Sequence, residues 1–282
     1  MRGEVREPGI TQRAAGLELR EGGIWFARGD ADQGFAGDDE TNWAEVEDRS
    51  FWYQHRNALL LDVLRRFPYQ GWLFEIGAGN GAVARALEAA GLPVVAVEPT
   101  VAWAKRARQR GLRHVICAHF EKAGFSAGTL DNVGLFDVLE HIERDLEFLR
   151  DLRRLMPAGG RLYLAVPAFQ SLWSHEDELS GHRRRYRKRA LAALVERAGF
   201  RPEYSSYFFA PLAPAIWMAR ALPYKLGLAR SRTHASSAAD HGVSDSIGAK
   251  MMRAALSVEH AMLRNGLPLP GGSSLLMVAR AT

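Results

Sequence analysis

The chain has very little cysteine and no apolar run long enough to span a bilayer. Cys117 is the only cysteine among 282 residues, which excludes an internal disulfide and any cysteine-based zinc site. It lies in the apolar run His114–Phe120, where we interpret it as a buried strand residue. The longest nearly apolar window, Tyr207–Ala219, contains two prolines and is shorter than the ~20 residues that a membrane-spanning helix needs. Met1–Glu4 carries charge where a secretory signal needs an apolar core, so we expect a cytoplasmic protein.

Lysine is also scarce, with five residues, so arginine supplies almost all of the positive charge. The 37 basic and 32 acidic residues nearly balance, and the net charge of +5 is too small to indicate a protein built around nucleic acid. A hydrophobic content of 47% is typical of a globular protein and excludes a disordered one.

Strand and helix patterns alternate through the middle of the chain. Glycine or proline ends most of the helical segments, as at Gly91, Gly111 and Pro157. Apolar runs predict strands over Trp72–Ile76, Pro93–Val97, His114–Phe120, Asp131–Phe136, Arg161–Val166, Tyr204–Phe209 and Ser274–Ala279. Helical spacing predicts helices over Ala82–Ala90, Val101–Arg110, Asp145–Met156, Arg189–Ala198 and Ser244–Arg264. This alternation predicts an α/β fold with a doubly wound, Rossmann-like, mostly parallel sheet and helices on both faces.

Composition divides the chain into five parts. Residues 1–42 form an N-terminal extension with a hairpin in Gly16–Arg28 that turns at Gly22-Gly23, and residues 43–70 form a helical lid. Residues 71–209 form the core domain. Residues 210–265 form an insertion or cap, irregular up to 243, and residues 266–282 return to the core as its last strand.

The segment Phe74–Gly81, FEIGAGNG, places a carboxylate and three glycines at the end of the first core strand. Glycines are needed where backbone adopts unusual dihedral angles or touches a ligand closely. A second acid, Glu98, ends the next strand, where it can accept hydrogen bonds from ribose hydroxyls. A nicotinamide dehydrogenase shares the ribose acid but offers no role for Glu75, because a carboxylate beside a pyrophosphate is electrostatically unfavourable. Glu75 therefore favours a positively charged cofactor.

From Trp72 to Val166 the chain resembles the class I S-adenosylmethionine-dependent methyltransferases, and FDVLEHI, Phe136–Ile142, is similar to the DVLEH motif of a small-molecule branch. The resemblance implies S-adenosylmethionine as the cofactor. It implies a set of cofactor-binding residues on four successive strand ends: Glu75, Gly77, Ala78, Gly79, Gly81, Glu98, Pro99, Phe120, Glu121, Phe136 and Asp137. The third strand departs from the family pattern, because His119 and Gly124 replace its usual aspartate and proline.

After the fifth strand, Ser171–Leu191 resembles a bacterial segment of this branch with a G-H-x-R-R-Y pattern. Its position at the carboxyl edge of the sheet is where an acceptor enters. Histidines and arginines there predict a polar or acidic acceptor held through forked hydrogen bonds. The expected acceptor-binding residues are His175, Asp177, His182, Arg184, Arg185 and Tyr186. Arg187, Lys188 and Arg189 are interpreted as a solvated helix start.

The aromatic segment Ser50–Asn57 precedes the core. Trp52, Tyr53 and Arg56 are candidates for a lid that excludes water from the acceptor, and packing on the sheet edge is the alternative. His141 and His182 are the candidate general bases, needed only if the acceptor must lose a proton. His141 can also be an ordinary residue at a helix start. No metal is expected, since His175, Asp177 and His182 match no familiar ligand spacing.

The sequence thus predicts a methyltransferase acting on a small polar or acidic metabolite, with a sugar- or lipid-linked acceptor included, held near residues 171–186. Two alternatives remain open: a nucleic-acid methyltransferase, and a non-catalytic S-adenosylmethionine-binding protein. No stable nucleic-acid partner is expected, because strand four lacks the proline pair of base-modifying members. Residues 207–228 combine Phe208, Trp217 and Met218 with basic flanks, and form either a membrane or partner contact or a cap over the acceptor.

Overall fold

The computed structural model describes residues 8–20, 22–28, 50–228 and 247–282. The predicted start of the lid, 43–49, lies outside the described residues, as do parts of the N-terminal extension and the stretch 229–246. Within the described chain, no helix combines the length and the apolar character needed to cross a membrane.

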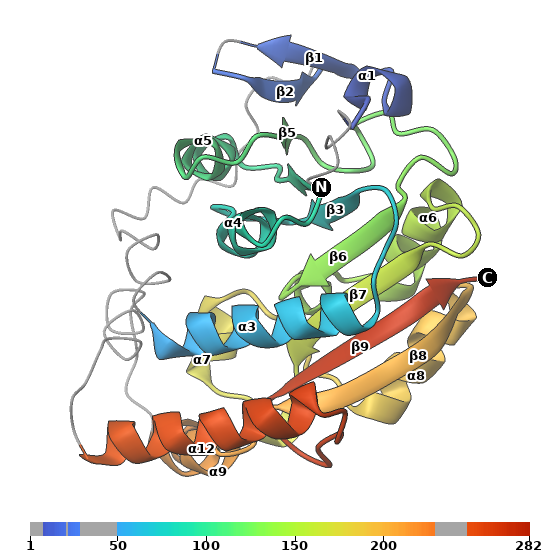
Figure 1. The fold of residues 1–282 in the computed structure, drawn as a ribbon. Helices are drawn as coiled ribbons and strands as arrows, with labels where there is room; N and C mark the ends of the chain where they lie inside the picture. The colour runs from blue at the N-terminus through green and yellow to red at the C-terminus, as the bar shows by residue number, and fades with distance from the viewer. Residues whose placement is uncertain (1–7, 21, 29–49, 229–246) are drawn as a thin grey trace.

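The described residues form one nine-stranded sheet in the order β1-β2-β5-β4-β3-β6-β7-β9-β8 (Figure 1). The strands are β1 (Leu17–Arg20), β2 (Ile24–Ala27), β3 (Leu73–Ile76), β4 (Val94–Val97), β5 (Val115–Cys117), β6 (Asn132–Phe136), β7 (Arg161–Pro167), β8 (Phe200–Phe208) and β9 (Ser274–Ala281). Strands β2 to β7 pair in parallel, whereas β9 runs antiparallel between β7 and β8. The chain order reverses on either side of β3, which is the switch point where such sheets bind ligands. The predicted fold class is confirmed.

Helices cover both faces of the sheet, so its central strands are apolar on both sides. One face carries α3 (Phe51–Arg66), α4 (Ala82–Ala89), α5 (Val101–Gln109) and α12 (Ile247–Arg264). The other carries α1 (Ile10–Arg13), α6 (Asp145–Leu155) and α8 (Lys188–Arg197). Neighbouring β3 residues show the alternation, since Leu73 packs in one core and Phe74 in the other.

The predicted hairpin is present as β1 and β2, with positive φ angles of 89° at Gly22 and 74° at Gly23. It extends the sheet, because β2 pairs in parallel with β5 at Ile24–Val115. Strand β8 is longer than predicted at its start. It lies at the edge of the sheet, where a proline is tolerated, and its register shifts between Pro202 and Tyr204.

The prediction of irregular structure after residue 210 is wrong for the described part. Helical turns α9 (Leu212–Ile216), η3 (Trp217–Ala221) and α10 (Leu222–Lys225) follow one another without a break. Pro214 lies in the first turn, where its missing N–H would have no helical partner. Pro223 follows the π-helical turn η3, which adjusts the backbone before the proline.

Buried Glu259 of α12 joins the lid helix to the end of β8. Its carboxylate accepts the backbone N–H groups of Phe209 and Ala210 at 2.7 and 2.6 Å, and His55 Nε2 of α3 lies 2.9 Å away. Phe209 has a φ of 58° and stacks on Trp52 with ring centroids 5.0 Å apart. Residues from three distant parts of the chain thus fix the position of α3 over the sheet.

Gly272 and Gly271 provide a matched test of the packing before β9. A Cβ on Gly272 would lie 2.1 Å from the Phe208 carbonyl oxygen, whereas a Cβ on Gly271 meets nothing within 4 Å. We expect Gly272→Ala to lower the free energy of unfolding by about 1–3 kcal/mol through overpacking. Gly271→Ala should change it by less than ~0.5 kcal/mol. Urea titration measures both, and equal stability of the two variants would contradict this packing.

Candidate functional site

The glycine loop after β3 contains two packing glycines and one that faces open space. Gly77, Gly79 and Gly81 have φ angles of 73°, 56° and 80°. A Cβ would lie 2.7 Å from Val138 on Gly77 and 2.5 Å from Leu112 on Gly81. On Gly79 it would meet only Trp103, at 3.7 Å. Gly79 is therefore the position where a ligand can approach the backbone.

Two buried carboxylates border this loop. Glu75 and Glu98 are each 3% exposed, and Ala78 beside them is buried. Glu98 accepts the N–H groups of Gly79 and Thr100, both at 2.8 Å, and so ties the loop to the start of α5. Burial raises the pKa of Glu98, although these hydrogen bonds and the charge of His119 act in the opposite direction. Half-buried Pro99 follows directly.

The third strand end differs from the expectation. Phe120 packs in the core against Phe148, with ring centroids 5.0 Å apart, and Glu121 is exposed. The charge close enough to Glu98 to affect its pKa is that of His119. His119 is therefore a further candidate on the cofactor side, and the roles of Phe120 and Glu121 stay predictions. The signal for His119 in the sequence was its place one residue earlier, where the family pattern has an acid.

Trp103 is a second residue that the sequence analysis missed. It lies on α5, is 40% exposed, and is the nearest side chain to Gly79. An exposed aromatic two residues into a helix that follows the ribose acid is the signal that could have identified it.

The lid reaches the end of β6 through an ion pair. Arg56, 7% exposed, pairs with Asp137, whose φ is 57°. Its guanidinium also lies over the rings of Trp52 and Tyr53, 5.2 and 5.1 Å from their centroids. Phe136 before Asp137 is buried in the sheet. The three predicted lid residues and Asp137 are thus brought together.

Glu140, His141 and His182 converge next to Asp137. Glu140 and His141 belong to the short helix η1 (Leu139–His141), and His182 follows α7 (His175–Leu179). The two imidazole rings meet edge to face at 4.8 Å. Burial first, and then the charge of His182, lowers the pKa of His141. Burial first, and then the charge of Asp137, raises the pKa of Glu140 well above its usual range.

Asp177 organises the segment around His182. It is 1% exposed, and its Oδ1 lies 2.9 Å from His182 Nδ1. Arg185 donates to both oxygens, with Nε–Oδ1 at 2.8 Å and Nη2–Oδ2 at 3.0 Å, and the Ser174 N–H donates at 2.9 Å. Burial acts to raise the pKa of Asp177, but the hydrogen bonds from His182 and Arg185 outweigh it and hold the pKa below its usual value.

The remaining residues of the segment are engaged within the protein. Arg184 pairs with Asp145 at 2.9 Å, and the buried Tyr186 hydroxyl donates to the same carboxylate at 3.0 Å. His175 Nδ1 lies 2.8 Å from Glu178 Oε2 at the outer side of α7. Arg184, Arg185 and Tyr186 thus have partners within the protein that hold the rim in place, and their part in binding an acceptor stays a prediction.

The arrangement of loop, paired acids and switch-point sheet is that of a class I methyltransferase. A family model described as a methyltransferase domain matches residues 51–205, more than half of the chain, and the chain therefore belongs to this family. No curated protein matches the sequence.

Solved structures with the same fold are similar over most of the chain. An S-adenosylmethionine-dependent methyltransferase from Thermotoga maritima is 18% identical, with a TM-score of 0.51 over 86% of this chain and 96% of that one. One from Archaeoglobus fulgidus is also 18% identical, with a TM-score of 0.51 over 85% and 100%. A geranyl diphosphate methyltransferase is 16% identical, with a TM-score of 0.50 over 82% and 79%.

S-adenosylmethionine is the cofactor, and the residues at the switch point fit it. The open face of Gly79 leaves room for backbone contact with the ligand, and buried Glu75 supplies a carboxylate for a cationic group. Glu98 accepts the backbone N–H groups of Gly79 and Thr100 on different oxygens, and the Thr100 side chain donates to it as well. The two carboxylate oxygens have about four lone pairs, so they can also accept a hydroxyl group of the ligand.

Alanine substitutions at Gly79, Gly81 and Gly91 can distinguish a block to ligand binding from the strain of a positive φ angle. We expect Gly79→Ala to weaken S-adenosylmethionine binding by at least about ten-fold, ~1.4 kcal/mol, because the methyl group occupies the ligand's approach. Gly91→Ala is the matched control, with a φ of 81° and no atom within 4 Å of its Cβ. Gly81→Ala should instead destabilise the fold. Calorimetry with S-adenosylmethionine measures the effect, and equal affinities of the Gly79 and Gly91 variants would contradict it.

Proposed function

We propose that the protein transfers the methyl group of S-adenosylmethionine to a small polar metabolite, including sugar- or lipid-linked acceptors, held beside residues 171–186. The observation that carries this proposal is the Asp177–His182 pair, which lies next to His141 and Glu140 at the carboxyl edge of the sheet. Methyl transfer needs in-line alignment of acceptor, methyl carbon and sulfur more than elaborate acid–base chemistry. The paired histidines add a means of removing a proton.

The proton would leave the acceptor towards His182. An ionised carboxylate only accepts hydrogen bonds, so the contact with Asp177 favours the neutral tautomer of His182 that carries its proton on Nδ1. In that tautomer Nε2 has a lone pair and can accept a proton. An acceptor hydroxyl would give its proton to Nε2 as its oxygen forms a bond to the methyl carbon and the carbon–sulfur bond breaks. His141, whose pKa is lowered, is the neighbouring group that can relay this proton.

The sequence analysis predicted a polar or acidic acceptor, and the acidic alternative depended on arginines that could bind it. Arg56, Arg184 and Arg185 are paired with Asp137, Asp145 and Asp177, and buried Glu140 adds a further acid. A neutral polar acceptor fits this rim better than a phosphate or carboxylate. The same pairing disfavours the nucleic-acid methyltransferase, which needs arginines available to phosphate groups.

Turnover with labelled cofactor tests the proposal directly. The protein, incubated with methyl-labelled S-adenosylmethionine and a panel of hydroxylated and amino metabolites, should yield a labelled small molecule. Label recovered only on added RNA or DNA would favour the nucleic-acid alternative. Cofactor binding with no labelled product on any acceptor would favour the non-catalytic one.

Variants of the rim separate catalysis from cofactor binding. We expect His182→Ala to reduce turnover by about a hundred-fold or more, and Arg185→Ala to reduce it because Asp177 loses its partner. S-adenosylmethionine affinity should stay within a few-fold. Arg187→Ala, an exposed arginine two residues away, is the control that should keep full turnover. If both test variants equal this control, the acceptor must bind elsewhere.

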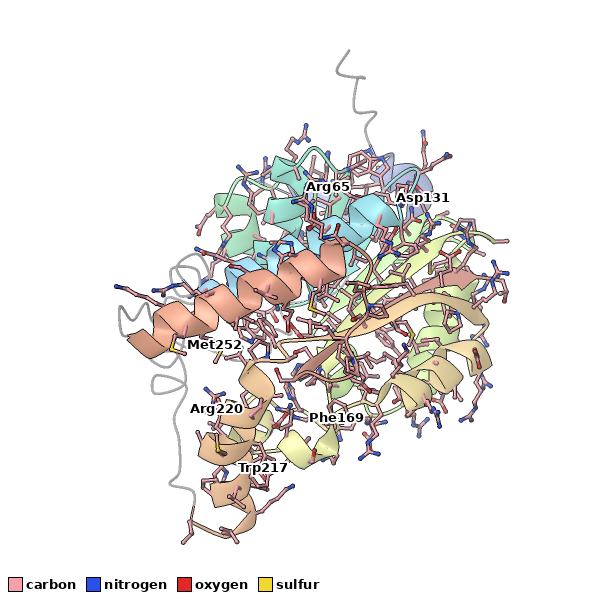
Figure 2. All side chains as sticks on the ribbon, turned by 60° about the horizontal axis from the view of Figure 1, so that its bottom comes forward. Arg65, Asp131, Phe169, Trp217, Arg220 and Met252 are labelled. Carbon is pink, nitrogen blue, oxygen red and sulfur yellow. The ribbon has the colours of Figure 1, made fainter. Side chains whose placement is uncertain are left out.

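The outer side of the segment α9–α10 is the second element of the proposal. Phe208 and Phe209 of the predicted surface are buried, but Trp217, Met218, Leu226 and Leu228 are 41%, 60%, 61% and 72% exposed. Figure 2 shows Trp217 and Arg220 on this segment, which extends beyond α12. We propose that this face contacts an anionic membrane surface carrying a lipid-linked acceptor, as a cytoplasmic enzyme would meet the inner leaflet.

Flotation with vesicles containing an anionic phospholipid tests this contact. The protein should co-migrate with the vesicles, and the double variant Met218→Asp, Leu226→Asp should not, because both charges would enter the lipid interface. Leu19→Asp is the control, on an exposed residue of the hairpin at the opposite end of the molecule (Figure 1). If the unaltered protein does not co-migrate with the vesicles, the membrane contact is contradicted, and a cap over the acceptor is the remaining interpretation of residues 207–228.

A further inference from the structure

Three side chains beside the rim have the composition of a metal site. Glu140, His141 and His182, hereafter the Glu–His–His cluster, each offer one ligand atom, and these atoms lie within 4.8 Å of one another. They come from η1 after β6 and from the turn after α7, two elements adjacent at the carboxyl edge of the sheet. The backbone holds them together, since the Arg183 N–H donates to the Glu140 carbonyl at 2.8 Å.

Glu140 is buried in a way that the described residues do not satisfy. Its exposed fraction is 0%, and within the described part of the chain neither side-chain oxygen receives a hydrogen bond. The nearest positively chargeable atom is His182 Nε2, 3.9 Å from Oε1. A buried carboxylate without hydrogen bonds is unfavourable unless it is protonated, paired with a cation or bound to a metal ion. One carboxylate oxygen of Glu140 lies within 4.8 Å of a ring nitrogen of both His141 and His182, so an ion held by the cluster would satisfy it.

Each of the two histidines has a further hydrogen-bond partner outside the cluster. Asp177 fixes Nδ1 of His182 at 2.9 Å and is itself held by both forks of Arg185. His141 has a hydrogen bond with the backbone of Gly181. Metal-binding histidines characteristically donate their second ring N–H to a carboxylate or a backbone carbonyl, which fixes the tautomer and directs the free nitrogen at the ion. The chain supplies this support for both histidines of the cluster.

We propose that the Glu–His–His cluster binds a divalent transition-metal ion of the zinc class. Two imidazoles and one carboxylate suit Zn²⁺ or Fe²⁺, whereas Mg²⁺ and Ca²⁺ prefer sets made of oxygen alone. Tetrahedral bonds of ~2.0–2.2 Å place ligand atoms ~3.4 Å apart. Side-chain rotation must therefore bring the three ligand atoms closer together, from 3.9 Å between Glu140 and His182 and from no more than 4.8 Å for any pair. Three protein ligands leave one position of the ion open, as in catalytic zinc sites.

The proposed ligands differ from the three residues considered in the sequence analysis, which were His175, Asp177 and His182. His175 turns to Glu178 on the outer side of α7, and both oxygens of Asp177 are occupied by His182 and Arg185. Neither residue can serve as a ligand in this arrangement. The partners of His182 are instead Glu140 and His141, about forty residues earlier, a separation that no local ligand spacing reveals.

The role of the ion rests on the proposed function, although its binding does not. An acceptor hydroxyl on the open position would lose its proton more readily, because a divalent ion lowers the pKa of a bound oxygen. The proton passes to solvent, the oxygen forms a bond to the methyl carbon, and the carbon–sulfur bond breaks to leave S-adenosylhomocysteine. When the ion is bound, Nε2 of His182 is one of its ligands and does not accept the acceptor's proton. The ion then takes over the role of making that proton easier to lose.

Zinc uptake by the full chain tests the site. Chelator-treated protein, titrated with Zn²⁺ by calorimetry and checked by metal analysis after gel filtration, should bind one ion per chain. Glu140→Gln and His141→Ala should each weaken Zn²⁺ binding by at least about ten-fold. Loss of a residue that only supports a ligand typically costs 10–100-fold in metal affinity, and loss of a ligand itself should cost at least as much. Asp177→Asn should weaken it less, since His182 keeps its nitrogen but loses its orientation.

Two histidine variants serve as matched controls. His175→Ala removes a half-buried imidazole from the same segment, and His260→Ala removes one paired with Asp62 on the α3–α12 side. Both should retain Zn²⁺ binding within a few-fold. Absence of uptake by the unaltered chain, or uptake unchanged in both Glu140→Gln and His141→Ala, would overturn the proposal. S-adenosylmethionine titrated into the same chelated samples reports on the proposed function separately, because its site at Gly79 and Glu98 contains no residue of the cluster.

Discussion

The buried carboxylate of Asp177 is the interaction on which the rim of the site depends. A charge at 1% exposure is strongly unfavourable unless it is paired, and here Arg185, His182 and the Ser174 N–H satisfy both of its oxygens. This arrangement fixes the turn after α7 and orients the imidazole of His182 at the same time. Through its contact with Nδ1, the carboxylate of Asp177 sets the orientation of the His182 imidazole.

The two halves of the site are connected by charge pairs across the sheet edge. Arg56 from the lid reaches Asp137 at the end of β6, and Tyr186 and Arg184 after β7 reach Asp145 at the start of α6. Each pair therefore ties together segments that follow or precede different strands. The arginine-rich composition therefore serves internal pairing near the site more than recognition of an outside anion.

Periodicity and glycines were sufficient to predict the sheet, because each strand and helix is a local pattern ended by a local signal. The glycine loop and the acids Glu75 and Glu98 could be placed for the same reason, since their position at strand ends follows from chain order. The partners of Arg185, His182 and Glu140 could not, because they depend on which side chains meet across the sheet edge. The sequence predicts that Arg185 binds an anionic group of the acceptor. The structure shows that Nε and Nη2 of its guanidinium already donate to Asp177.

The helical segment after residue 210 shows a different limit. Pro211, Pro214 and Pro223 are strong helix-breaking signals, but the first two occupy a helix start and the third follows a π-helical turn. Tertiary packing of Ala221 and Leu212 then outweighs local propensity. His119 and Phe120 show a further limit, because the pattern alone does not resolve which of two adjacent residues is buried in the core and which carries a charge that affects Glu98.

The insertion of β9 between β7 and β8 sets the order in which the molecule can be completed during translation. Strand β8 has β9 as its only neighbour within the described sheet, and α12, whose Glu259 anchors the lid helix, lies between them in the chain. While residues 274–281 are still inside the ribosome, the first seven strands can assemble, but β8 has no edge to join. The nascent chain thus exposes the open edge of β7 until β9 has left the ribosome, and only then can β8 join the sheet.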